Sequence, residues 1–562
     1  MKLVEQFIGK FGRHQAWLYF LLSLPFAIAG IQVIAFNFTG GVPRTRCFVP
    51  GLDGNQSGFG ELGFDSPTVK SIFAPASSQY GENQLCNYCP ELAQRFIADG
   101  GAVAGNCSAD VAIPCDQGFV YSREQYSWTL VMRFDLVCQY SWKRQVASSC
   151  FMLGFLVGAV SAGAISDRFG RRPVVLAYSL IGMVTYHLVI VVPNYALLCI
   201  LHIINGAMCH GAYITAYVIV MEVMGGLGRT ICGIWVQGLF AIGLIYFGIC
   251  AYFLRDYRWL QFAASAPALI LPIYYWLVPE SIRWLIVHDR KEEAKKILKK
   301  AAKMNDREIN EEELNRAIET ERNAEEKSAI QGEKPEEATV IDMFRYRWLA
   351  IMTLIIDYTW FACGMSYYGL ALNTSDLPGD DYTNYFIGSC VELIAYLIVI
   401  PMLERWGRRP TMVSTLGLGG VAVVISALLP KSVGWLIVTL AMIGRIGAAG
   451  AFAVVYNYAA ELFPTVTRNG GIGVASMCAR IASLSAPLIY LLGPYVQPWL
   501  PFVVYGVVAI LGAVLDMILP ETLGRPLPET LADGVKLASL GKRTGRIASS
   551  DKELDQARNS GL

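Results

Sequence analysis

Four charged residues lie inside long apolar segments of this sequence, where a charge is costly. Asp357, Glu392, Arg445 and Arg480 each fall near the middle of a run long enough to cross a membrane. Each charge at that depth costs roughly 2.5–3.5 kcal/mol on insertion scales. We therefore expect these side chains to face a water-filled cavity and bind an ionic ligand. The alternative is two ion pairs that only join helices of the C-terminal half.

Aromatic residues recur beside these charges at helical spacing. Trp360 follows Asp357 by one turn, Tyr368 continues that face, and Tyr456 shares a face with Arg445. A quaternary or protonated amine is held over aromatic rings by cation–π contact. The pattern predicts a binding site for a small organic ion, built from Arg480, Asp357, Trp360, Tyr367, Tyr368, Glu392, Arg445 and Tyr456.

The apolar runs that carry these residues recur along almost the whole chain. Of its 562 residues, 54% are hydrophobic and 16% charged, which is too apolar for an ordinary soluble enzyme. A membrane-spanning helix needs about 20 apolar residues. Twelve segments qualify, so the sequence predicts an all-α membrane protein with twelve transmembrane helices: 16–38, 146–165, 174–192, 196–220, 230–254, 259–278, 348–372, 385–403, 411–429, 434–460, 471–492 and 498–519.

A charged motif occurs once in each half of the chain. The pattern acid-Arg-aromatic-Gly-Arg-Arg-Pro fills residues 167–173 and 404–410, and two further landmarks, Glu-x6-Arg and Pro-Glu-Ser/Thr, repeat at nearly the same offset. Such a repeat predicts two six-helix halves in tandem. We expect its charges to form a conformational latch at the cytoplasmic face, although binding of lipid phosphate alone would explain the arginines. The latch residues are Asp167, Arg168, Arg171, Glu222, Arg229, Glu404, Arg408, Glu461 and Arg468.

The distribution of Lys and Arg among the short loops predicts that both termini are cytoplasmic. The expected domains are an N-terminal six-helix half (1–279) that contains an extracellular Cys-rich loop after helix 1 (41–143), a cytoplasmic helical loop (280–347), a C-terminal six-helix half (348–519) and a cytoplasmic tail (520–562).

The extracellular loop holds an even set of cysteines and two glycosylation sequons. We expect up to three disulfides in an oxidising space, with the connectivity left open, from Cys47, Cys86, Cys89, Cys107, Cys115 and Cys138. The pair Cys86 and Cys89 alone would be a weak metal or redox motif. The sequons predict glycosylation at Asn55 and Asn106.

Together these motifs resemble the major facilitator superfamily, and within it the organic ion transporter family of organic cation, organic anion and carnitine carriers. The resemblance rests on the GxxxDRxGRR motif, "AELFPTVTRN", "LPETLGRPLPET" and the Cys-rich loop, and it runs from about residue 11 to residue 531. His202 and Ala29 depart from residues that relatives carry there. Relatives that carry organic cations generally have an acid where Arg480 stands.

The resemblance implies a plasma-membrane secondary carrier that works by alternating access on organic cations or carnitine-like zwitterions. Arg480 implies a carboxylate on the substrate, which Asp357 or Glu392 would complement at an amine. An organic anion exchanger and a receptor without transport are the alternatives. The sequence contains no GxxxxGK[ST] and no HExxH motif. We therefore expect no enzyme activity, metal or cofactor. Membrane lipid is an expected partner and nucleic acid is not, while coupling to sodium or protons and the oligomeric state stay open.

Overall fold

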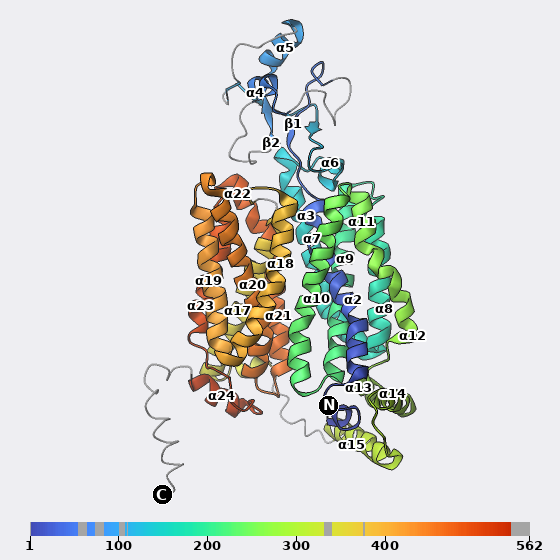
Figure 1. Cartoon of the computed structure of the whole chain (residues 1–562). Coiled ribbons are helices and arrows are strands. Elements are labelled where there is room, and N and C mark those ends of the chain that lie inside the picture. Colours follow the sequence, from blue (N-terminus) through green and yellow to red (C-terminus); the bar gives the residue numbers. More distant parts are fainter. Residues whose placement is uncertain are drawn as a thin grey trace.

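The computed structural model describes residues 2–53, 64–73, 84–99, 107–108, 111–330, 340–374 and 377–540. Long helices form a bundle with a small domain at one end and a group of short helices at the other (Figure 1). We call these the domain end and the repeat end, because the repeated charged motif lies at the latter. Helix α1 (Lys2–Ile8) and helix α24 (Leu531–Leu540) both lie at the repeat end.

The helices fall into two side-by-side groups (Figure 1). The first comprises α2 (Arg13–Ile34), α3 (Phe36–Thr39), α7 (Ser141–Phe169), α8 (Arg171–Leu188), α9 (Tyr195–Val223), α10 (Gly226–Phe253), α11 (Tyr257–Ser265), η2 (Ala266–Ile273) and α12 (Tyr274–Leu277). The second comprises α17 (Arg347–Leu372), α18 (Asp381–Arg405), α19 (Arg408–Leu428), η4 (Lys431–Val433), α20 (Gly434–Leu462), α21 (Arg468–Tyr490), α22 (Leu492–Tyr495) and α23 (Leu500–Asp516).

Ten helical segments of the described chain are long and apolar enough to cross a membrane. Two of the twelve predicted segments, 174–192 and 498–519, correspond to α8 and α23, which are not among the ten. Helix α23 has only 17 residues, and the 18 residues of α8 begin with Arg171 and Arg172.

Glycines set the closest helix contacts in both groups. A Cβ on Gly206 of α9 would lie 2.1 Å from the Phe151 carbonyl oxygen of α7, and a Cβ on Gly447 of α20 would lie 2.4 Å from the Thr415 carbonyl oxygen of α19. No larger residue permits this backbone approach. Each group therefore contains a helix pair whose close approach depends on glycine.

The domain at the far end, which we call the loop domain, is built on two small sheets. Strand β1 (Thr45–Cys47) pairs in parallel with β2 (Gln84–Leu85) and antiparallel with β5 (Phe119–Tyr121), and β3 (Asn87–Tyr88) pairs antiparallel with β4 (Ile113–Pro114). Short helices α4 (Pro67–Ile72), α5 (Pro90–Asp99), α6 (Leu130–Phe134) and η1 (Cys138–Tyr140) complete it.

Three disulfides hold the loop domain together, and they use all six of its cysteines. The pairs are Cys47–Cys115, Cys86–Cys138 and Cys89–Cys107. The sequence alone did not determine which cysteines pair. The two predicted glycosylation sites, Asn55 and Asn106, lie outside the described residues.

Short helices at the repeat end form a group that we call the helical cap: α1, α13 (Ile282–Val287), α14 (Lys291–Met304) and α15 (Glu311–Ile330). Leu285, Leu298 and Leu314 make its fully buried core. Asn305 ties the cap to α2, because its amide donates to the Ile8 carbonyl and its oxygen accepts from the His14 N–H at 2.8 Å. One further short helix, α16 (Val340–Met343), precedes α17.

Candidate functional site: a central aromatic cavity and two charged networks

A small cavity lies between the two helix groups and is lined from both of them. The space that the centre of a water molecule can reach inside it is about 30 Å³, enough for about two water molecules at most. Its lining consists mostly of phenylalanine and tyrosine: Ala29, Phe155, His210, Tyr213, Gln237, Phe240, Tyr367, Tyr368, Tyr396, Phe452, Tyr456 and Arg480.

Arg480 is the charged residue of this lining, and it is 3% exposed. Its Nη1 donates to the Tyr368 hydroxyl at 3.3 Å, and its guanidinium carbon lies 5.3 Å from the centre of the Phe155 ring. Its Nε has no hydrogen-bond partner. Among the described residues, no carboxylate lies within ion-pair distance of Arg480, so its charge is balanced by aromatic and hydroxyl groups alone.

Glu392 and Arg445 form a buried ion pair behind the cavity wall. The Arg445 Nη2 lies 3.3 Å from the Glu392 Oε2, and these side chains are 4% and 0% exposed. The other oxygen of Glu392 accepts hydrogen bonds from the Tyr367 hydroxyl at 2.6 Å and the Tyr396 hydroxyl at 3.0 Å. Neither charge lines the cavity, but Glu392 fixes two of the hydroxyl groups that do.

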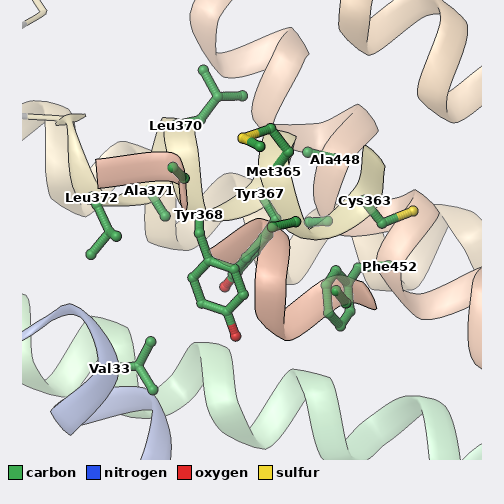
Figure 2. Packing of buried hydrophobic residues seen from close by; sticks show 14 of the residues in the cluster. Val33, Cys363, Met365, Tyr367, Tyr368, Leu370, Ala371, Leu372, Ala448 and Phe452 are labelled. Carbon is green, nitrogen blue, oxygen red and sulfur yellow. The ribbon is translucent and has the colours of Figure 1, made fainter. Parts of the chain in front are cut away.

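The aromatic residues of α17 and α20 meet at the cavity. Figure 2 shows Tyr367 and Tyr368 next to each other with Phe452 close by, and the Tyr367 and Phe452 ring centres are 5.6 Å apart. Trp360 is fully buried one layer further out, with its ring centre 4.4 Å from that of Tyr456. Trp360 therefore supports the lining rather than forming it.

Asp357 does not join this group. It lies on α17 with an unpartnered, buried Oδ1, and the cavity lining does not include it. The four charges singled out in the sequence thus separate into a buried pair, an isolated carboxylate and one arginine that faces the cavity.

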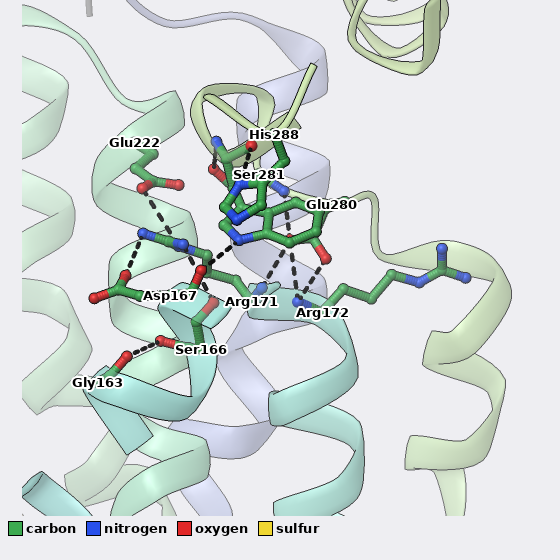
Figure 3. A network of polar contacts seen from close by, with 10 residues as sticks. Gly163, Ser166, Asp167, Arg171, Arg172, Glu222, Glu280, Ser281 and His288 are labelled. Atoms are coloured by element: carbon green, nitrogen blue, oxygen red, sulfur yellow. Dashed lines mark hydrogen bonds and ion pairs between the residues drawn. The ribbon is translucent and has the colours of Figure 1, made fainter. Parts of the chain in front are cut away.

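The N-terminal charged motif forms a network at the repeat end (Figure 3). The Arg171 Nη2 lies 2.9 Å from the Asp167 Oδ1, and its Nε lies 3.7 Å from the Glu222 Oε1. The Glu280 carboxylate accepts from the backbone N–H groups of Arg171 and Arg172 at 2.9 and 3.2 Å. A carboxylate is favourable there because the first N–H groups of a helix carry partial positive charge.

The C-terminal motif repeats this arrangement. The Arg408 Nη2 lies 2.8 Å from the Glu461 Oε1, and the Glu521 carboxylate accepts from the N–H groups of Arg408 and Arg409, both at 2.9 Å. Gly407 precedes α19 with φ 95° and ψ 179°, a conformation that is essentially restricted to glycine. A Cβ there would also lie 2.7 Å from the Glu521 carboxyl group.

The remaining motif residues lie at the edge of these networks. The Arg168 guanidinium lies over the Phe169 ring, and Arg468 donates to the Phe463 carbonyl rather than to Glu461. Glu404 is exposed. The side chain of Arg229 lies outside the described part of the chain.

Several residues of these sites were missed in the sequence. Glu280 and Glu521 were read only as markers of the repeat, yet they cap α8 and α19. Gln237 lines the cavity from the first helix group. A polar residue at mid-depth in an apolar segment is the signal that could have found Gln237.

Comparison with known proteins agrees with this geometry. A family described as "Sugar (and other) transporter" matches residues 119–532. The "Organic cation transporter protein" of Drosophila melanogaster is 34% identical over 528 residues, which cover 94% of this chain and 93% of that protein. The human "Organic cation/carnitine transporter 2" is 31% identical over 549 residues, which cover 96% and 95%. This chain belongs to the organic ion transporter family of the major facilitator superfamily.

This organic ion transporter also shares its fold with solved structures. The proton:xylose symporter XylE bound to 6-bromo-6-deoxy-D-glucose superposes with a TM-score of 0.57 at 14% identity, and the match covers 93% of this chain and 98% of that one. The inward open xylose transporter XylE from E. coli gives 0.53 at 16% identity, covering 71% and 90%. The family match, the two relatives and the ten apolar segments together identify the chain as a multi-pass membrane transporter and not an enzyme.

Proposed function

We propose that this transporter is a secondary carrier of small zwitterionic organic ions of the carnitine and betaine class. The observation that carries the proposal is Arg480, a buried arginine that faces an aromatic cavity with no carboxylate beside it. A buried cation without a negatively charged partner is costly. A substrate carboxylate would remove that cost by accepting two parallel hydrogen bonds from the guanidinium group.

The rest of the lining suits the positive end of such a substrate. Tyr368, Phe452 and Tyr456 line the cavity and pack against one another as a cluster of aromatic rings, and a quaternary ammonium group binds aromatic faces without needing a counter-charge. Glu392 acts through the hydroxyls of Tyr367 and Tyr396. The names of the human and Drosophila relatives support organic cations and carnitine, and they do not favour an organic anion exchanger.

Alternating access follows from the small volume of the cavity. About 30 Å³ is too little for a zwitterion of several carbon atoms, so the two groups must move apart to admit one. Two hydrogen bonds reach the second helix group near the domain end. The Asn37 side-chain amide donates to the Ala371 carbonyl at 2.7 Å, and the Tyr126 hydroxyl donates to the Asp381 carboxylate at 2.6 Å. We propose that they close the outer side in this conformation, while the networks of Arg171 and Arg408 act as the latch at the repeat end.

We propose that α8 and α23 also cross the membrane, which gives twelve transmembrane helices in two six-helix halves. We place the loop domain outside the cell because its disulfides need an oxidising compartment. The helical cap and both termini then lie in the cytoplasm, Asn55 and Asn106 carry glycans, and the transporter resides in the plasma membrane.

Uptake of labelled carnitine by cells that express the transporter tests the proposal. We expect saturable uptake that excess betaine inhibits strongly, and that a simple quaternary cation and a dicarboxylate each inhibit weakly. Parallel assays with and without sodium show whether uptake is coupled to sodium. Uptake blocked mainly by the dicarboxylate would indicate an anion exchanger, and surface protein without uptake of any probe would indicate a receptor.

A further inference from the structure

Asp516 is a fully buried acid that the proposed substrate site does not use. It is the last residue of α23 and is 0% exposed. Its Oδ1 lies 2.6 Å from the Thr359 hydroxyl of α17, and its Oδ2 has no hydrogen-bond partner among the described residues. Among those residues no basic side chain lies within ion-pair distance of Asp516, so nothing offsets a negative charge here.

The bonding of Thr359 indicates which group holds the proton. The Thr359 hydroxyl is 2.9 Å from the Ile355 carbonyl oxygen and 2.6 Å from the Asp516 carboxyl oxygen. A hydroxyl has one proton and two acceptor sites. If it donates to the Ile355 carbonyl, as threonine commonly does within a helix, then the short contact is a donation from a protonated Asp516.

Two uncharged titratable side chains from other helices lie near Asp516. Cys363 on α17 and Tyr458 on α20 are the titratable side chains that interact with it electrostatically. Tyr458 also donates its hydroxyl proton to the Pro520 carbonyl at 2.8 Å. Tyr458 in turn interacts electrostatically with Glu461 on α20, Glu521 after α23 and Arg409 on α19, all at the repeat end.

We propose that Asp516 is a proton-binding site of this transporter, protonated in the present conformation and in exchange with water at the repeat end. Loss of the proton to that water would leave a carboxylate facing the apolar contact between α17 and α23. The Thr359 hydroxyl would then have to turn away from Ile355 to solvate it. Alkaline pH on that side therefore weakens the contact and slows transport.

Infrared spectroscopy of the purified full-length protein in lipid tests this without any substrate. We expect a carbonyl band of a protonated carboxyl group, shifted by ¹³C-aspartate labelling and removed by raising the pH. Asp516→Asn should abolish this band, whereas Asp357→Asn, which changes the other isolated acid, should leave it. Thr359→Val should shift the band by removing its hydrogen-bond acceptor, and Thr359→Ser should restore its position. A band that persists in Asp516→Asn would overturn the proposal.

A second arm uses carnitine uptake into proteoliposomes at two internal pH values, and it rests on the proposed function. We expect slower uptake at the higher internal pH in the native protein and no such difference in Asp516→Asn, which mimics the protonated acid. An unchanged pH response in Asp516→Asn contradicts the proposal. If carnitine is not transported at all, only the proposed function fails, and the infrared result still decides the proton site.

Discussion

Gly407→Ala should destabilise the C-terminal half by adding one methyl group next to Glu521. The backbone of Gly407, with φ 95° and ψ 179°, costs roughly 1–3 kcal/mol for a residue with a side chain. The new Cβ would stand 2.7 Å from the Glu521 carboxyl group, which must then leave the N–H groups of Arg408 and Arg409. Losing hydrogen bonds to a charged acceptor adds about 1–3 kcal/mol, giving about 2–6 kcal/mol in all.

Gly524→Ala is the matched control, because Gly524 also has a positive φ, of 72°, but nothing lies within 4 Å of the added Cβ. It should cost only the backbone strain, about 1–2 kcal/mol. The assay is thermal unfolding of the purified variants, followed by tryptophan fluorescence. A double-mutant cycle with Glu521→Ala separates the clash from the strain, since the two changes should be non-additive. Equal unfolding of the two glycine variants, or strict additivity with Glu521→Ala, would refute the reasoning.

Three further outcomes are expected. Cys47→Ser should reduce delivery to the cell surface more than Cys89→Ser. Chain entropy predicts that a disulfide stabilises the fold by about 4 kcal/mol for a 68-residue separation and by about 3 kcal/mol for a separation of 18. Equal delivery of both variants would contradict this. Tyr126→Phe, which loses the bond to Asp381, should increase labelling of the cavity by external reagents, and unchanged labelling would count against an outer closure. Asn305→Ala should destabilise the helical cap by about 1–3 kcal/mol, seen as faster proteolysis between α14 and α15, and native resistance would refute its tie to α2.

The sequence predicted the features that depend on composition and periodicity. Long apolar runs gave the spanning helices, and the repeat at residues 167–173 and 404–410 located both charged networks. The even cysteine set indicated disulfides but not their pairing, because pairing depends on which strands meet: β1 brings Cys47 beside the chain that carries Cys115.

The sequence did not separate the roles of the buried charges. Asp357, Glu392, Arg445 and Arg480 all fall at mid-depth, but depth along a helix axis says nothing of rotation about it. Rotation and neighbouring helices place Glu392 against Arg445, leave Asp357 outside the lining and turn Arg480 into the cavity. Asp516 escaped notice because it lies at the end of α23, where an acid is ordinary at a membrane surface.

The central claim is that Arg480 receives the carboxylate of a zwitterionic substrate. The most direct test measures the uptake of carnitine and of a simple quaternary cation by Arg480 variants, with each rate normalised to surface protein. Arg480→Ala should lower carnitine uptake about 10- to 100-fold, since a charge-assisted bond is worth about 1.5–3 kcal/mol, and should leave uptake of the cation comparatively unaffected. Arg480→Lys should retain part of the carnitine uptake, and Arg480→Asp should favour the cation. Equal loss of both substrates at normal surface abundance would contradict the account and leave Arg480 as a structural residue.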